Sequence, residues 1–190
     1  GMHDYHLLYN GSMRLARTRN LDQLWMVFAN HTQLLTAFRA HDCLFVHAGV
    51  VGWQGRAMVI PGRSMTGKTT LVRALLEAGA SYYSDEFAVL DRAGQVYPYP
   101  VPLSIREQIG RPGRKTPVEA LGGEAGGAPL PVGLVVVTRY EKSARWRPQA
   151  LTPAQAMLAL MDNTVAAQRD PGHSMPILRQ VAMGARTIES

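Results

Sequence analysis

Eight consecutive residues have types and spacing that could bind a phosphorylated ligand. They match the pattern G-x-x-x-x-G-K-[ST] and are Gly62, Arg63, Ser64, Met65, Thr66, Gly67, Lys68 and Thr69. Between a strand and a helix, the backbone N–H groups of such a loop and the helix N-terminus hold a β-phosphate. The lysine then reaches the β- and γ-phosphates, and the threonine hydroxyl can ligate Mg²⁺. The alternative interpretation is a glycine-rich turn with an exposed lysine.

The residues on either side of this segment favour phosphate binding. Residues 57–60 are apolar and read as a short strand, and residues 70–78 have a helical pattern that ends at Gly79. We therefore predict a nucleoside-triphosphate site made by residues 62–69 and by Thr70 in the first turn of the helix.

Two adjacent carboxylates, Asp85 and Glu86, follow a short predicted strand over residues 81–84. The chain returns from the predicted helix through this strand, so we expect its end to lie beside Lys68. A carboxylate there can bind Mg²⁺ or accept a proton from a hydroxyl group. Because neighbouring side chains of a strand point to opposite faces, we expect only Asp85 to face the loop. A solvated acidic turn is the alternative.

His47 lies in an apolar stretch, residues 43–51, that residues 52–55 turn back into the strand before the loop. A regular hairpin register would place His47 near the mouth of the loop. A lone histidine in a sheet is more often a packing residue, so its pattern alone leaves both roles open.

The other elements are expected to be structural. Residues 5–18 read as one or two strands, a second hairpin joins residues 87–90 to residues 96–99, and residues 134–137 form a buried strand. Residues 111–131 contain nine Gly or Pro and predict a flexible loop. A last long helix is expected to begin at Thr152.

A further helix is predicted to begin at Asn20, which has capping-box spacing to Gln23. Its apolar residues fall on one face, which we expect to pack into the core: Leu21, Leu24, Trp25, Phe28, Leu35 and Phe38.

Length and composition predict one globular domain over residues 1–190. The net charge of +6, from 20 Lys+Arg against 14 Asp+Glu, favours anionic partners such as nucleotides or phosphoproteins. Nucleic-acid binding is not expected, because the basic residues are dispersed and show no interleaving with aromatic residues. The single Cys43 cannot form an internal disulfide, and no membrane-spanning run or signal peptide is visible, so we expect a cytoplasmic protein.

Several of these motifs together resemble the catalytic domain of HPr kinase/phosphorylase, and more closely the small HPr-kinase-related proteins of bacteria. The resemblance is strongest over residues 43–106. It is carried by His47-Ala48-Gly49, the loop at residues 62–69, and Ser84-Asp85-Glu86, with spacings that also match.

The resemblance implies an α/β fold with a phosphate-binding loop, mixed sheets and flanking helices, related to phosphoenolpyruvate carboxykinase. It implies ATP and Mg²⁺ as cofactors, with Thr69 and Asp85 near the metal. The positions matching His47 and Asp85 lie at the transferred phosphate in that kinase, where the aspartate is the base toward a serine hydroxyl. Glu86 stands where the kinase has a second aspartate, and Met65 where it usually has glycine.

The sequence therefore predicts phosphoryl transfer from ATP–Mg²⁺ to a serine-type hydroxyl on a protein or small molecule. Asp85, His47 and Lys68 are the expected catalytic residues, and Glu86 and Arg106 are candidate substrate or phosphate contacts. A salt-bridged surface role for Arg106 is an equal alternative. A non-catalytic ATP-binding accessory protein and a simple ATPase or GTPase also stay open, as does a homo-oligomer. The acceptor is not named by the sequence, and the choice of ATP over GTP depends on the family.

Overall fold

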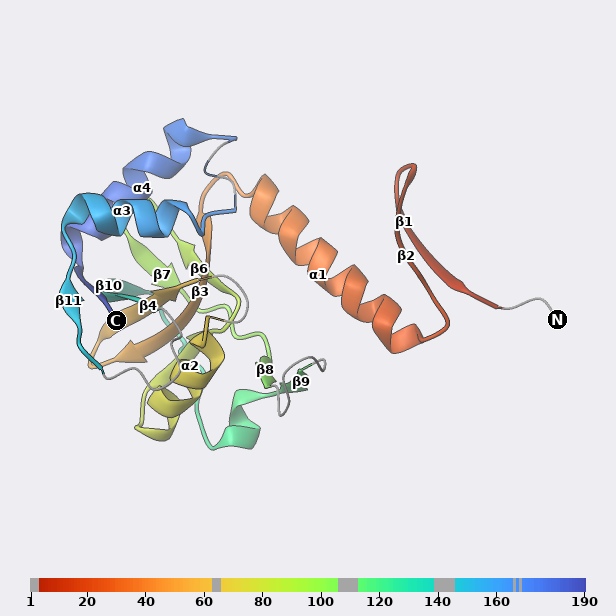
Figure 1. Ribbon diagram of the computed structural model, residues 1–190, viewed down its shortest axis with the longest axis horizontal. Helices are drawn as coiled ribbons and strands as arrows, with labels where there is room; N and C mark the ends of the chain where they lie inside the picture. Colours follow the sequence, from red (N-terminus) through yellow and green to blue (C-terminus); the bar gives the residue numbers. More distant parts are fainter. Residues whose placement is uncertain (1–3, 63–65, 106–112, 139–145, 166, 168) are drawn as a thin grey trace. The chain divides into compact units, whose positions relative to one another are not determined.

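The computed structural model describes residues 4–62, 66–105, 113–138, 146–165, 167 and 169–190 (Figure 1). The chain divides into two compact units, Gly1–Ala40 and His41–Ser190. Each unit is described by itself.

The first unit is a hairpin followed by a helix. Strands β1 (His6–Asn10) and β2 (Met13–Thr18) pair antiparallel, and α1 spans Leu21–Arg39. The Asn20 side chain accepts a hydrogen bond from the Gln23 backbone N–H at 3.1 Å, which satisfies one orphan donor of the first turn. The predicted strands and the predicted start of the helix are confirmed.

The expectation that the apolar face of this helix packs into a core is wrong. Ala37 is the one buried residue among the described residues of this unit, and Trp25, Phe28 and Phe38 are all exposed. A two-stranded hairpin covers only one side of a helix of 19 residues.

The second unit is built on a mixed sheet. The sheet order in the described residues is β11-β12-β10-β4-β3-β6-β7, and β5 also pairs with β3. Strand β10 is parallel to β4 and β12, while β3 is antiparallel to its neighbours. The strands are β3 (Leu44–Trp53), β4 (Arg56–Pro61), β5 (Ser81–Ser84), β6 (Phe87–Leu90), β7 (Gln95–Tyr97), β10 (Leu130–Val137), β11 (Gln149–Ala150) and β12 (Arg186–Glu189).

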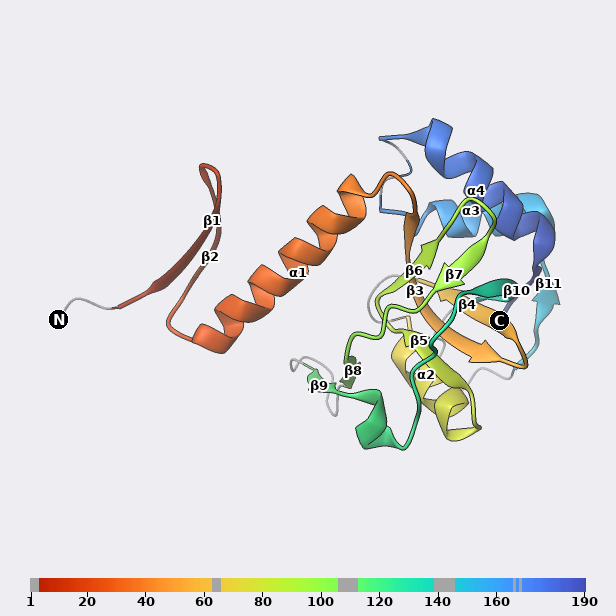
Figure 2. The same ribbon diagram turned by 180° about the vertical axis from the view of Figure 1, so that it is seen from behind.

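Helices flank this sheet on both sides (Figures 1 and 2). Helices α3 (Pro153–Met161) and α4 (Pro171–Gly184) lie on one side, where Leu160, Leu178 and Val181 join one apolar cluster. Helix α2 (Lys68–Glu77) lies on the other, where Val72 and Leu76 join a second cluster. The α/β class, with a mixed sheet and flanking helices, is therefore confirmed.

Both predicted hairpins are present. Strands β3 and β4 pair from Ala48↔Pro61 to Trp53↔Arg56 without a break in register. Their two-residue turn has positive φ at Gln54 (49°) and Gly55 (75°), as the favoured type I′ turn requires. Strands β6 and β7 form the second hairpin.

The prediction of a flexible loop over residues 111–131 is not upheld for residues 113–131. They contain β9 (Arg114–Thr116), which pairs with β8 (Leu103–Ile105), a 3₁₀ helix over Val118–Leu121, and the start of β10. Glycine serves close packing here, because a Cβ on Gly126 would overlap the Tyr83 ring.

The predicted last long helix is wrong. Helix α3 begins at Pro153 with the expected Thr152 capping box, but it ends at Met161. Helix α4 then begins at Pro171, capped by Asp170, and leads into β12. Pro153 and Pro171 each occupy the first helical position, which favours a helix start at both places. Among the described residues, no helix combines the length and apolar character needed to cross a membrane.

Candidate functional site

The glycine-rich segment joins β4 to α2, and we call residues 62–69 the glycine loop. A Cβ on Gly62 would lie 2.6 Å from Thr66 Oγ1, so the Thr66 side chain packs against the first residue of the loop. Gly67 is the N-cap of α2 with φ of 88°, a conformation that favours glycine. Thr138, just after β10, donates from Oγ1 to the Thr66 carbonyl at 3.4 Å. Arg63, Ser64 and Met65 lie outside the described residues.

The start of α2 is polar and lacks the usual negative cap. Gly67 offers no side-chain cap, and the first turn of the helix, which holds Lys68, Thr69 and Thr70, contains no acidic residue. A helix start of this kind favours a bound anion, since its N–H groups and dipole point toward the loop.

Asp85 lies where the sequence predicted, beside the start of α2. Its side chain is buried (9% exposed), and Oδ2 accepts a hydrogen bond from Thr69 Oγ1 at 2.8 Å. Oδ1 is also buried and has no hydrogen-bond partner among the described residues. A buried carboxylate oxygen without a partner is costly, so this atom is a natural position for a proton or a bound cation.

Burial shifts the pKa values of Asp85 and Lys68. Desolvation raises the pKa of Asp85 to about 6, and the Thr69 hydrogen bond and the positive charge of Lys68 oppose it only in part. Burial lowers the pKa of Lys68, against the opposing charges of Asp85 and then Glu86. The site therefore holds an acidic and a basic side chain in a poorly solvated environment.

Gly49 of β3 allows these groups to approach the sheet. A Cβ there would lie 2.6 Å from Val72 Cγ2, 3.7 Å from Lys68 Cβ and 3.9 Å from Asp85 Oδ1. Any larger residue would push α2 away from the strand. The sequence motif His47-Ala48-Gly49 includes this residue but does not predict its packing role. A glycine inside an apolar strand was the available signal.

His47 lies beside the glycine loop, as the hairpin register predicted. Its carbonyl accepts a hydrogen bond from Gly62 N–H at 3.1 Å, and its N–H donates to the Asn163 carbonyl at 2.7 Å. Because His47 and Gly49 are two residues apart in β3, both side-chain positions face α2. The half-buried ring lies 4.6 Å from the Phe87 ring and belongs to neither apolar cluster.

Glu86 is less separate from the site than strand alternation predicted. Ser84 Oγ accepts hydrogen bonds from the N–H groups of Glu86 and Phe87, so the chain bends here instead of continuing as a strand. The negative charge of Glu86 consequently contributes an upward shift to the pKa values of Lys68, Asp85 and Tyr99. For Lys68 the larger effect of burial still lowers the pKa.

The sequence patterns do not indicate two segments that adjoin the site. Residues 163–165 follow α3 and contact β3, where Val165 N–H donates a hydrogen bond to the Phe45 carbonyl. This part of β3 precedes the residues that pair with β4. The backbone of Ser104 in β8 also lowers the pKa of Asp85. These contacts join distant parts of the chain, so no local pattern could have shown them. Arg106 lies outside the described residues.

The described residues do not form a closed metal cage. No group of three or more His, Cys, Asp or Glu side chains among them could hold a metal ion. Asp85 and Thr69 would offer two oxygen ligands, and Mg²⁺ commonly takes one or two protein oxygens together with substrate phosphates. The residues present therefore fit Mg²⁺ if a phosphate ligand completes its coordination.

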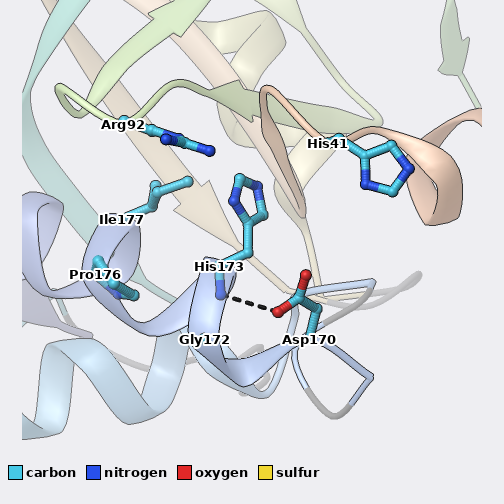
Figure 3. Close-up of a pocket in the computed structure, with 7 residues that line it drawn as sticks. All are labelled: His41, Arg92, Asp170, Gly172, His173, Pro176 and Ile177. Carbon is cyan, nitrogen blue, oxygen red and sulfur yellow. Dashed lines mark hydrogen bonds between the residues drawn. The ribbon is translucent and has the colours of Figure 1, made fainter.

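A separate pocket lies at the start of α4 (Figure 3). It has a volume of about 490 Å³, and His41, Arg92, Asp170 and His173 are among the residues that line it. Asp170 Oδ1 accepts a hydrogen bond from the His173 N–H at 3.0 Å, which is the helix cap. None of the glycine-loop residues lines this pocket, so it is not part of the site described above.

Comparison with protein-family models gives no match to this chain, and comparison with curated proteins gives none either. The function is therefore inferred from the site itself.

Replacing the buried carboxylate with an amide tests the electrostatics of the site. Since the pKa of Asp85 is raised from 3.8 to about 6, protonation stabilises the folded protein. That contribution is complete below about pH 4 and is lost as pH rises through about 6. Asp85→Asn should therefore stabilise the ligand-free protein at pH 8 by up to about 3 kcal/mol, at about 1.4 kcal/mol per pKa unit.

Thermal unfolding of both proteins at pH 8, 6 and 4.5 measures this difference, which should shrink as pH falls. A lower melting temperature for the variant at pH 8 would mean that Asp85 is a structural carboxylate.

Proposed function

We propose that this protein binds ATP–Mg²⁺ at the glycine loop and transfers the γ-phosphoryl group to a serine-type hydroxyl. The observation that carries the proposal is the buried cluster at the start of α2. There the Asp85 carboxylate meets the Thr69 hydroxyl at 2.8 Å, beside the buried Lys68. The cluster combines a cation, a hydroxyl and a carboxylate at an uncapped helix start, which are the components of a phosphate and metal site.

Each group has a role in this proposal. Lys68 and the first amides of α2 offset phosphate charge, and Thr69 with Asp85 would hold Mg²⁺, which supplies further neutralisation when bound. The acceptor oxygen bonds to the γ-phosphorus as the bond to the β-phosphate oxygen breaks, and ADP leaves. Asp85 takes the hydroxyl proton.

The pKa of about 6 suits Asp85 for this step. A base with that pKa is largely deprotonated at neutral pH, yet it binds a proton more strongly than an ordinary aspartate does. His47, on the same face of β3 as Gly49, would orient or stabilise the transferring group.

The finer fold assignment, to the HPr kinase and phosphoenolpyruvate carboxykinase type, belongs to this proposal. It is supported by the antiparallel β3–β4 hairpin that leads into the glycine loop and by the Ser84-Asp85-Glu86 bend. A cytoplasmic location is also proposed, because ATP is available there and the free Cys43 stays reduced.

Lys68→Ala should abolish ATP–Mg²⁺ binding measured by calorimetry, because the neutral side chain cannot offset the phosphate charge. Arg73→Ala is the matched control. Arg73 lies on the same helix, and its substitution removes the same charge, but Arg73 is exposed and pairs with Glu77. Equal affinity of wild type and Lys68→Ala for ATP would refute the site assignment.

Asp85→Asn should leave affinity for ATP without Mg²⁺ within a few-fold and lower phosphoryl transfer by about 100-fold or more, the usual scale for loss of a general base. Glu86→Gln, the neighbouring control, should have a milder effect. In wild type, kcat/KM should fall as pH drops below about 6, because Asp85 becomes protonated.

The assay uses labelled ATP with water, free L-serine or serine-containing peptides as the acceptor. Turnover with water alone would identify a simple ATPase, and binding without turnover an accessory protein. Full activity of Asp85→Asn would exclude Asp85 as the base.

His47→Gln should lower phosphoryl transfer while ATP binding persists, because His47 contacts the first residue of the loop through its backbone carbonyl, which the variant keeps. His173→Gln is the control, since that histidine lines the separate pocket. If both variants transfer phosphate at the wild-type rate, His47 is a packing residue against Phe87.

A further inference from the structure

The first unit has too small an interior to be stable by itself. Among its described residues only Ala37 is buried, although the unit contains many large apolar side chains. Those at least one-third exposed are Tyr5, Leu7, Tyr9, Met13, Leu21, Trp25, Met26, Phe28, Leu34 and Phe38. Forty residues with almost no buried core need another surface to cover them.

The exposed side of α1 has the spacing of a helix-packing seam. Residues 21, 25, 28, 32, 35 and 39 are separated by four, three, four, three and four positions, which places them along one stripe. Leu21 (48%), Trp25 (58%) and Phe28 (45%) are exposed on it, and Trp25 and Phe28 meet edge to face at 5.7 Å. The hairpin covers a different stripe, since Asn10 contacts His31.

This seam is symmetric about Asn30 and suits an antiparallel copy of itself. In such a pair, Trp25 packs near Leu35 of the second copy, Phe28 near Thr32 and Leu21 near the stem of Arg39. The acidic residue of the first turn, Asp22, then lies near the basic residue of the last turn, Arg39. The two helix dipoles also oppose each other favourably.

We infer that α1 is a self-association surface through which two copies of this chain pair antiparallel. The inference is independent of the proposed function. The helix is about 28 Å long at 1.5 Å per residue. A strip about 10 Å wide along it falls below the roughly 800 Å² per partner of a standard interface. We therefore expect a reversible dimer with a dissociation constant in the micromolar range.

Sedimentation of the full chain between about 1 and 200 μM tests the inference. Wild type should approach twice its chain mass of 20.8 kDa as concentration rises. Trp25→Asp should weaken association at least about 100-fold, because each dimer loses two central aromatic contacts. Trp146→Asp is the matched control, since Trp146 is equally exposed (62%) but lies in the second unit.

Charge reversal tests the antiparallel arrangement with variants that keep the seam. Asp22→Arg and Arg39→Asp should each weaken the dimer several-fold, and the double variant should restore it. Each change also opposes the dipole of α1, so restoration in the double variant cannot come from a more stable helix.

Circular dichroism confirms that α1 remains helical in each variant. A helical wild type that stays monomeric throughout would overturn the inference, whether the seam packs on His41–Ser190 of the same chain or awaits another protein. A dimer unaffected by Trp25→Asp would overturn it as well, and failure of the double variant to recover would overturn the antiparallel pairing.

Discussion

The close approach of α2 to β3 is the constraint on which the rest of the site depends. Gly49 lacks the side chain that would separate the helix from the strand, and Val72 fills that space instead. The first turn of α2 is thereby brought against the sheet, together with the end of β5 and its bend. Lys68 and Asp85 are buried there, and the half-buried Thr69 donates a hydrogen bond to Asp85.

Burial gives these residues properties that their types alone do not have. An exposed aspartate has a pKa near 4 and an exposed lysine one above 10, so the two would be fully charged and well solvated at neutral pH. In this site desolvation moves both pKa values toward neutrality, and Asp85 keeps one oxygen without a hydrogen-bond partner among the described residues. Burying these charges destabilises the folded protein, and a ligand that carries phosphate and metal would offset this destabilisation. Such a conflict between stability and function is common.

The two units of the chain differ in how far they bury their apolar side chains. In the second unit the mixed sheet is covered on both sides, and strands such as β3 and β6 are almost wholly buried. In the first unit the same kinds of apolar residues stay exposed, because a hairpin and one helix cannot surround them. Amphipathic spacing in a sequence therefore indicates that a face will be covered, but it does not indicate by what.

Local features of this protein were determined by the sequence itself. Residue types and short spacings account for Gly67 at the start of α2, the β3–β4 hairpin, the Asn20 and Thr152 caps and the position of Asp85. Features that depend on contacts between distant segments were decided only by the tertiary structure. These include the packing of residues 163–165 against β3, the bend that brings Glu86 near Lys68, the ordered elements in residues 113–131 and the burial that shifts the pKa of Asp85. The physical reason is that conformational preferences and hydrogen bonds within a turn act over a few residues, whereas desolvation depends on whatever the whole fold places around a side chain.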